Sequence, residues 1–250
     1  MIDFHSHILP GIDDGAQDTE TSLEMLKICS DTGIDTIVAT PHCHPVSQDK
    51  IYRFLERREK AAERLCSAIL ASTEKYPKVV IASEVRIYNG MSKYEDLDKL
   101  TIGDTKYILL EMPYEKWKYD TFDEIYNITQ LGFKPIMAHL DRFLDQEHLF
   151  GELYALDLLY QINSCAFLDK NTRKMIVRLF EKNAVHILGS DTHNLSDRKP
   201  DMAAAYEVLG KKFGSEFVEF VEKNGRNILK NKSVENRFPP KLGLIKKLMM

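Results

Sequence analysis

The strongest constraint on the fold of this chain is the regular alternation of short apolar runs with longer helical patterns. The apolar runs predict strands at residues 2–5, 36–40, 79–83, 107–110, 135–138, 160–163 and 185–189. The helical patterns predict helices at residues 19–32, 51–73, 121–131, 146–158, 170–183, 199–213 and 215–229. Short apolar strands are typical of a parallel sheet that is covered on both faces. This order of elements therefore predicts an α/β fold with right-handed crossovers.

Seven strands with helices between them fit a closed barrel better than an open sheet. No GxGxxG sequence follows the first predicted strand, which weakens the case for a dinucleotide-binding fold. Gly33 and Gly132 stand directly after two helical patterns, where glycine commonly ends a helix. We therefore expect a (β/α)7 barrel similar to a TIM barrel.

Composition excludes several classes of protein. The chain has 250 residues, of which 44% are hydrophobic and 29% charged, so it is neither disordered nor a membrane bundle. The formal net charge of −4 gives no support to a nucleic-acid partner. Residues 230–250 hold six basic residues and one acidic residue. We predict one domain over residues 1–230 and a basic C-terminal extension over residues 231–250. We interpret the extension as a solvated tail rather than as a contact for an acidic partner or a membrane surface.

The cysteines and the N-terminus indicate a cytoplasmic protein. Cysteines stand at positions 29, 43, 66 and 165, with no CxxC spacing, and a chain of this length needs no disulfides. The first residues have no basic segment followed by a long apolar one, as a signal peptide would. No run of 18 apolar residues is present, so we expect no stable membrane insertion. The oligomeric state stays open, and a homo-oligomer is possible.

Metal-binding residue types follow nearly every predicted strand. In α/β barrels the active site lies at the carboxyl ends of the strands. The seven ends carry His5-Ser6-His7, Thr40-Pro41-His42, Glu84, Glu111, His139, Asn163 and Asp191-Thr192-His193. Six of these seven ends therefore hold a histidine or a carboxylate, and we expect them to meet at one mouth.

Histidine and carboxylate without cysteine form the ligand set of a hydrolytic Zn²⁺, Mn²⁺ or Fe²⁺ site. Because side chains alternate along a strand, His5 and His7 should face the same side. Asp13 and Asp14 offer further carboxylates in the loop that follows. The candidates are too many for one ion, so two or three ions are expected. Such a cluster suits the hydrolysis of a phosphate ester.

Other residues of the same types have simpler interpretations. We interpret His148 and His186 as structural histidines and Cys43 as a bystander between two histidines, and we leave His44 undecided. No cysteine is followed by arginine six residues later, so the loop of cysteine-dependent phosphatases is absent. The sequence also lacks GxxxxGK[ST], HExxH and GxSxG motifs.

The opening string MIDFHSHILPGIDDG resembles the start of the bacterial PHP-domain protein-tyrosine phosphatases, the CpsB/CapC/YwqE type of capsule and exopolysaccharide systems. The resemblance continues, in order, through ATPH at 39–42, EVRIY at 84–88, KYILLEMPY at 106–114, AHLDRF at 138–143 and GSDTHN at 189–194. Arg198 follows at the family spacing. The match spans residues 1 to 230.

The resemblance implies a PHP-type distorted (β/α)7 barrel with three metal ions, most often Mn²⁺, with Fe, Zn, Co or Mg as alternatives. It implies one ion bound by His5, His7, Glu84 and Asp191. It implies a second bound by Glu84, Glu111 and His139, and a third bound by Asp14, His42 and His193. Arg142 and Arg198 would bind the phosphate, and with Asp14 they would be the catalytic residues.

The chain departs from the family pattern in two places. The loop that usually reads HPER reads His139-Leu140-Asp141-Arg142 here, which can loosen the loop and move Arg142. Cys43 and His44 after His42 are not a familiar family feature, and the extra imidazole can alter the metal preference.

The resemblance implies a phosphatase that hydrolyses phosphotyrosine on protein by metal-activated water, without a phosphoenzyme. Its expected substrate is the tyrosine-rich tail of a bacterial tyrosine kinase that controls capsular or exopolysaccharide synthesis. One alternative is a PHP phosphatase for a small ester such as histidinol phosphate. Another is a non-catalytic, metal-stabilised binding module, although the complete ligand set argues against it. A role in DNA repair is disfavoured because the barrel is acidic.

Overall fold

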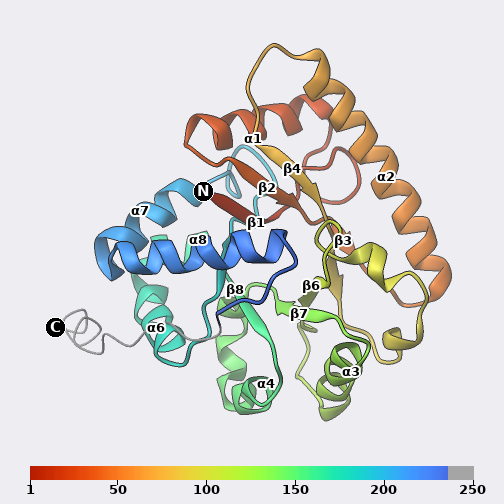
Figure 1. Ribbon diagram of the computed structural model, residues 1–250, viewed down its shortest axis with the longest axis vertical. Coiled ribbons are helices and arrows are strands. Elements are labelled where there is room, and N and C mark those ends of the chain that lie inside the picture. The colour runs from red at the N-terminus through yellow and green to blue at the C-terminus, as the bar shows by residue number, and fades with distance from the viewer. Residues whose placement is uncertain (236–250) are drawn as a thin grey trace.

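The computed structural model describes residues 1–235, apart from the side chains of Asn171, Arg173 and Lys174. Parallel strands curl through the middle of the molecule, and helices surround them (Figure 1). The strands are β1 (Ile2–Ser6), β2 (Thr36–Ala39), β3 (His42–Cys43), β4 (Lys78–Ile81), β5 (Glu84–Arg86), β6 (Tyr107–Glu111), β7 (Lys134–Met137), β8 (Leu159–Asn163) and β9 (Ile187–Gly189). The α-helices are α1 (Thr19–Asp31), α2 (Gln48–Ala71), α3 (Tyr119–Gln130), α4 (Phe150–Tyr154), α5 (Ser164–Leu168), α6 (Lys170–Glu181), α7 (Met202–Phe213) and α8 (Ser215–Leu229). Short 3-10 helices are η1 (Met91–Lys93), η2 (Leu97–Leu100) and η3 (Leu140–Leu149).

The nine strands occupy the seven positions that the sequence predicts. The hydrogen-bonded orders are β1-β2-β4 and β3-β5-β6-β7-β8-β9, and every pair is parallel. Two residues separate β2 from β3, and two separate β4 from β5, so each pair is one interrupted strand. The carbonyl of Pro41, inside the first interruption, still accepts a hydrogen bond from the Glu84 N–H at 3.1 Å.

The first and last strand positions meet and close the barrel. Ser6 and Thr192 form a parallel bridge. The N–H of His7 donates to the Thr192 carbonyl at 2.9 Å, and the N–H of Asp191 donates to the His5 carbonyl at 2.7 Å. The predicted α/β barrel is therefore confirmed, and its closure places the residues after β1 beside those after β9.

One apolar cluster fills the inside of this barrel, with members from every strand position. It comprises Ile2, Phe4, Val38, Ala82, Ile102, Tyr107, Leu109, Ile136, Ala138, Leu159, Ile187 and Ile228. A larger cluster lies between the strands and the surrounding helices. The interior is thus packed, as in other α/β barrels, and polar groups can gather only above this plug.

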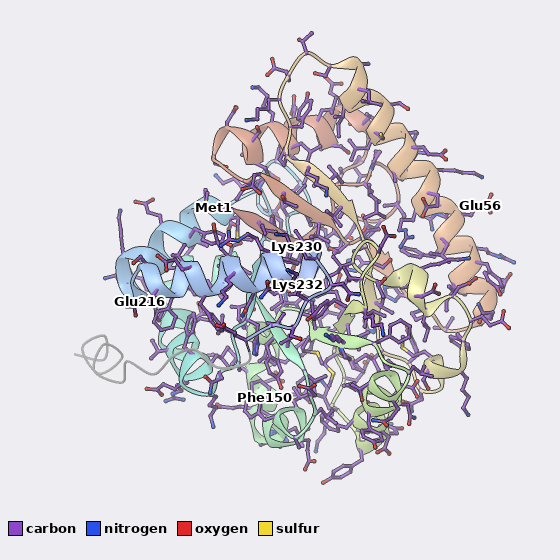
Figure 2. All side chains as sticks on the ribbon, viewed as in Figure 1. Met1, Glu56, Phe150, Glu216, Lys230 and Lys232 are labelled. Atoms are coloured by element: carbon purple, nitrogen blue, oxygen red, sulfur yellow. The ribbon has the colours of Figure 1, made fainter. Side chains whose placement is uncertain are left out.

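The end of α8 and the residues after it cover the opposite end of the barrel from the strand ends (Figure 1). A Cβ on Gly225 would lie 2.6 Å from a ring carbon of Phe4, so the helix packs directly on β1. The hydroxyl of Tyr107 donates to the Lys232 carbonyl at 2.6 Å, and Lys232 lies over the barrel centre in Figure 2. Residues 231–235 of the predicted extension therefore contact the barrel, and residues 236–250 lie outside the described residues.

Several helix boundaries differ from the predicted ones. The helix predicted over 146–158 is wrong: η3 and α4 occupy this region, and α4 ends at Tyr154 because the chain must turn into β8. The short helix α5, directly after β8, was not predicted. The helix ends predicted at Gly33 and Gly132 are confirmed, and both glycines have positive φ values, +88° and +87°.

Candidate metal centre

The two histidines of β1 aim the same ring nitrogen at the same point. Both side chains are fully buried, and the Nε2 atoms of His5 and His7 lie 3.1 Å apart. Glu84, the first residue of β5, places Oε2 at 3.4 Å from the former and 3.5 Å from the latter. Asp191, two residues after β9, places Oδ1 at 3.6 Å and 3.3 Å from the same atoms. His5 and His7 come from the first strand position and Asp191 follows the last one. This part of the site therefore lies where the first and last strand positions meet.

Glu84 connects this pair to two more histidines. Its Oε2 lies 2.7 Å from Nδ1 of His42 in β3, and its Oε1 lies 2.7 Å from Nε2 of His139 after β7. Glu111, the last residue of β6, places Oε1 at 3.6 Å from the same Nε2 of His139. Glu84 is therefore the central carboxylate, with both oxygens committed to the cluster.

The exposed edge of the cluster is formed by Asp14 and His193. Oδ1 of Asp14 lies 3.3 Å from Nε2 of His42 and 3.4 Å from Nε2 of His193. The Asp14 side chain is 65% exposed, so it stands at the opening, whereas His193 is buried. The structure thus brings into one site all nine residues that the sequence suggested as metal ligands.

Three of the histidines are held with Nε2 toward the cluster by acceptors on their other nitrogen. Nδ1 of His5 lies 3.2 Å from Oε1 of Gln161, and Nδ1 of His7 lies 2.8 Å from Oδ2 of Asp13. Nδ1 of His193 lies 2.9 Å from the Asp191 carbonyl oxygen. Each acceptor receives a hydrogen bond from an N–H at Nδ1, so the lone pair of Nε2 is left for a metal ion. Histidines that bind metal ions are usually oriented in this way.

The cluster contains buried polar atoms that no protein group satisfies. Among the described residues, these atoms have no hydrogen-bond partner: Nδ1 of His42, Oε2 of Glu84, Oε1 of Glu111, Nδ1 of His139 and Nε2 of His193. Burying unpaired polar atoms is costly, so their concentration in one place calls for a ligand. Histidine and carboxylate donors suit divalent ions such as Mn²⁺, Fe²⁺ and Zn²⁺, and the residues present fit a metal cluster.

Three overlapping groups have donor atoms close enough to share one ion. They are His7, Asp14, His42 and His193; His5, His7 and Glu84; and His42, Glu84 and Glu111. The groups resemble the three sets that the family pattern implied. They differ in three ways: His7 also joins the group of Asp14, His42 stands in the place expected for His139, and Asp191 is in none of the groups.

The carboxylate of Asp191 is bonded by two arginines. An Nη2 of Arg142 bonds Oδ2, and an Nη2 of Arg198 donates to Oδ1 at 2.8 Å. Asn163 donates to Oδ2 at 3.1 Å. The backbones of Asp191 and His139 both have positive φ values, +54° and +32°, which are uncommon for residues other than glycine and often mark functional sites. The two predicted phosphate-binding arginines thus lie at the cluster, paired with one of its carboxylates.

Burial and pairing shift the pKa values of the central groups. Burial disfavours a charged His7, but hydrogen bonds to Asp13 and Asp191 outweigh burial and raise the His7 pKa to about 10. Burial likewise opposes ionisation of Asp13, but its bond to His7 and backbone N–H donors lower its pKa to about 2. Burial and the neighbouring His7 charge lower the pKa of His193 to about 4. Hydrogen bonding thus favours an ionised Asp13 beside His7, and a metal ion at Nε2 of His7 would compete with a proton for that atom.

The structure separates the two neighbouring aspartates that the sequence left as alternatives. Asp13 accepts hydrogen bonds from the N–H groups of Gly15 and His42 as well as from His7, so it supports the loop. Asp14 faces the open edge of the cluster. This placement agrees with Asp14, not Asp13, as the candidate ligand.

The remaining histidines and Cys43 lie outside the cluster. His44 is exposed, with its ring centroid 6.0 Å from that of His42, and it belongs to none of the three groups. Burial raises the pKa of the Cys43 thiol to about 12, which keeps it protonated. His148 is exposed on η3, and His186 is buried where its Nδ1 accepts from the Tyr160 N–H at 3.1 Å.

Sequence reasoning missed Gln161, a buried polar residue in the middle of β8. Its Oε1 accepts from the His139 N–H at 2.8 Å as well as facing His5, and its Nε2 donates to Oδ1 of Asn163 at 2.9 Å. Gln161 and Asn163 are two residues apart and face the same side of a strand that is otherwise apolar. Asn163 was already named as the end of the sixth predicted strand, and the two-residue spacing from it was the signal by which Gln161 could have been found.

The chain is similar to known proteins over nearly its whole length. Residues 1–230 match the family described as "Capsular polysaccharide synthesis, CpsB/CapC". The chain belongs to this family. The tyrosine-protein phosphatase YwqE of Bacillus subtilis is 32% identical over 249 residues, which cover 96% of this chain and 95% of that protein. The tyrosine-protein phosphatase CpsB of Streptococcus pneumoniae is 31% identical over 233 residues, covering 86% of this chain and 92% of that protein.

Solved structures give the same result. A crystal structure described as that of YwqE from Bacillus subtilis and CpsB from Streptococcus pneumoniae, "unique metal-dependent tyrosine phosphatases", matches with a TM-score of 0.77 at 31% identity. The match covers 96% of this chain and 100% of that chain. A β-aspartyl dipeptidase from Fervidobacterium islandicum, at 15% identity and a TM-score of 0.54, shares the fold alone. The resemblance drawn from the sequence is thus confirmed, and these CpsB/CapC relatives are metal-dependent tyrosine phosphatases.

Within residues 1–235, no helix has both the length and the apolar character that crossing a bilayer requires.

Proposed function

We propose that this chain is a metal-dependent phosphatase that hydrolyses phosphotyrosine on protein. The observation that carries the proposal is the set of buried, unpaired donor atoms around Glu84, next to two arginines. The CpsB/CapC relatives are metal-dependent tyrosine phosphatases, and their similarity extends over nearly the whole of this chain. They support the same reaction. A cluster of three ions, with Mn²⁺ as the proposed metal, would be held by His5, His7, Asp14, His42, Glu84, Glu111, His139, Asp191 and His193.

When bound, divalent ions lower the pKa of a water molecule and neutralise charge on the phosphoryl group. The residues of this chain supply the remaining requirements. Arg142 and Arg198 are proposed to release Asp191 and to bind the phosphate oxygens of the substrate instead. Their planar guanidinium groups can each bind two such oxygens. Asp14, whose Oδ2 lies 4.0 Å from Nη1 of Arg198, is proposed to accept the proton of the attacking water at this exposed oxygen.

The proposed substrate is the phosphorylated, tyrosine-rich tail of a bacterial tyrosine kinase that controls capsular or exopolysaccharide synthesis, in the cytoplasm. The description of the family as one of capsular polysaccharide synthesis supports this choice. A small ester such as histidinol phosphate would use the same cluster, so the two substrates are to be compared in competition at equal concentration.

The test is phosphate release from a phosphotyrosyl peptide by the full chain loaded with Mn²⁺. His139→Ala removes the imidazole beside Glu84 and should reduce the rate to near background. His148→Ala, which removes an exposed histidine outside the cluster, is the matched control and should keep the wild-type rate. A folded wild-type protein that releases no phosphate with Mn²⁺, Fe²⁺, Zn²⁺, Co²⁺ or Mg²⁺ would contradict the proposal and favour a binding module.

A further inference from the structure

A groove of about 520 Å³ lies on the side of the barrel mouth formed by the loops after β3, β5 and β6. We call it the flanking groove, and its lining includes Val46, Arg86, Asn89, Glu115, Lys116 and Lys118. None of these residues belongs to the candidate metal centre. The loops that form the groove start at the same strand ends that present His42, Glu84 and Glu111.

Arg86, which lines the flanking groove, lies beside the candidate metal centre. Arg86 lies directly opposite Glu111 in the β5–β6 ladder. Its guanidinium carbon lies 4.9 Å from the centroid of the Tyr114 ring, which is half exposed. The Tyr114 ring lies 5.9 Å from the ring of Phe143, and that ring lies 5.7 Å from the imidazole of His139. A substrate chain leaving the metal centre on this side would therefore cross Tyr114 and enter the groove.

Both walls of the groove are fixed to the barrel. On one side the buried Trp117 donates its backbone N–H to Gln146 at 2.9 Å and its indole N–H to the Pro113 carbonyl at 3.1 Å. On the other side, the buried carboxylate of Glu124 accepts from the N–H groups of Gly90 at 2.8 Å and Ser92 at 2.5 Å. The groove is thus formed before any ligand binds, which reduces the entropy lost on binding.

The lining of the groove has three basic side chains against two acidic ones, Glu115 and Asp120, so its charges favour an acidic ligand. Arg86 pairs with Glu115 at 3.2 Å, but Glu115 is 78% exposed and such surface pairs are weak. Asp120 accepts from the side-chain amide of Asn89 at 2.7 Å. Within residues 1–235, Lys116 and Lys118 are exposed and form no ion pair. An incoming carboxylate would therefore meet two free ammonium groups and an arginine whose present partner is easily displaced.

We infer that the flanking groove binds acidic side chains of the substrate close to its phosphotyrosine, and that Glu115 occupies Arg86 in their absence. The inference rests on the proposed function and adds a substrate class to it. An extended peptide advances about 3.3 Å per residue, so the acidic residues that enter the groove would be close to the phosphotyrosine in sequence. The ligand class is an extended, acidic phosphotyrosyl peptide.

The test compares two phosphotyrosyl peptides that differ only in flanking charge. One carries glutamates on both sides of the phosphotyrosine, and the other carries glutamines at the same positions. The measured quantity is the ratio of kcat/KM for the acidic peptide to that for the neutral one, with Mn²⁺-loaded full chain. We expect a ratio of about five at low salt, falling as salt is added, because exposed charge pairs are each worth only a few-fold.

Variants of the groove then assign the preference to its residues. The double variant Lys116→Glu, Lys118→Glu should bring the ratio below one, and Glu115→Gln should raise it about twofold by releasing Arg86. Lys75→Ala, which removes an exposed lysine before β4, is the matched control and should leave the ratio unchanged. Fluorescent copies of both peptides are titrated in parallel, so that binding is read even without turnover.

The outcomes separate this inference from the proposed function. If both peptides are hydrolysed and bound equally well by wild type, the flanking groove is not an acidic subsite, while the phosphatase stands. If neither is hydrolysed but the acidic one binds more tightly through Lys116 and Lys118, the groove stands and the phosphatase fails.

Discussion

Nδ1 of His42 lies 2.7 Å from Oε2 of Glu84, yet neither atom has a hydrogen-bond partner among the described residues. Two ligand-type atoms this close can both contact one bound cation. The second oxygen of Glu84 lies 2.7 Å from Nε2 of His139, so one carboxylate faces histidines on both sides. This geometry suits a carboxylate that bridges two ions.

Replacing Glu84 with glutamine should therefore abolish the bridge while keeping the size of the side chain. We expect metal content to fall below that of wild type and phosphatase activity to drop by at least about a hundredfold, more than changes around metal ligands usually cost. Metal analysis of the purified protein and phosphate release are the measurements. Glu63→Gln, which alters an exposed glutamate of α2, controls for the loss of one charge. Full metal content and activity in Glu84→Gln would show that the carboxylate bridges nothing.

Removing the metal should lower the thermal stability of the chain, because the free energy of binding is added to that of folding. An ion present at a hundred times its Kd contributes about 2.7 kcal/mol. For a domain of this size that corresponds to about 5–10 °C in Tm. Thermal melts with a chelator, and again after Mn²⁺ is returned, give the shift. The Glu84→Gln variant should show a smaller shift, and equal melts with and without bound metal would count against a metal cluster in the folded site.

The strand ends were predictable because they depend on local patterns. Short apolar runs predicted the seven strand positions. The residues that follow these runs included His42, Glu84, Glu111 and His139, which could therefore be named as candidate ligands before the fold was known. The interruptions inside two strands were not predicted, although Pro41, which has no N–H to donate to a ladder, stands in the first of them.

Long-range pairing was the part that the sequence could not supply. The positions of Arg142 and Arg198 were found, but not that both would bond to Asp191. For Arg142 this depends on how η3, 49 residues earlier in the chain, lies over the barrel mouth. The 3-10 geometry of η3 was missed for the same reason: its course is set by tertiary bonds such as that from the Trp117 N–H to Gln146.

Asp13 offers a test of the groups that orient the ligands. Oδ2 of Asp13 accepts a hydrogen bond from Nδ1 of His7 at 2.8 Å. Asp13→Asn should therefore weaken the bond that fixes the orientation of the His7 ring, without removing a ligand. We expect metal affinity or activity to fall about 10- to 100-fold, the usual cost at such positions. Titration of the ion-free protein with Mn²⁺ measures the affinity. Asp123→Asn, on the exposed side of α3, is the matched control, and an unchanged Mn²⁺ affinity in Asp13→Asn would exclude an orienting role.

Gly15 holds the loop that carries Asp13 and Asp14 against β1, and it has no room for a side chain. A Cβ there would lie 2.1 Å from the carbonyl oxygen of His7 and 2.5 Å from its Cβ. Gly15→Ala must therefore push the loop away, which should lower the free energy of unfolding by about 1–3 kcal/mol and weaken metal binding. Urea denaturation and metal analysis measure the two effects.

Gly151→Ala provides the opposite expectation in the same protein. A Cβ at this position in α4 meets nothing within 4 Å, so alanine should raise the free energy of unfolding by about 0.4–1 kcal/mol by restricting the unfolded chain. Metal content should stay at the wild-type value. A contradicting result would be that both glycine variants change stability in the same direction and keep their metal. In that case the close approach of the Gly15 loop to His7 does not hold Asp13 and Asp14 in place.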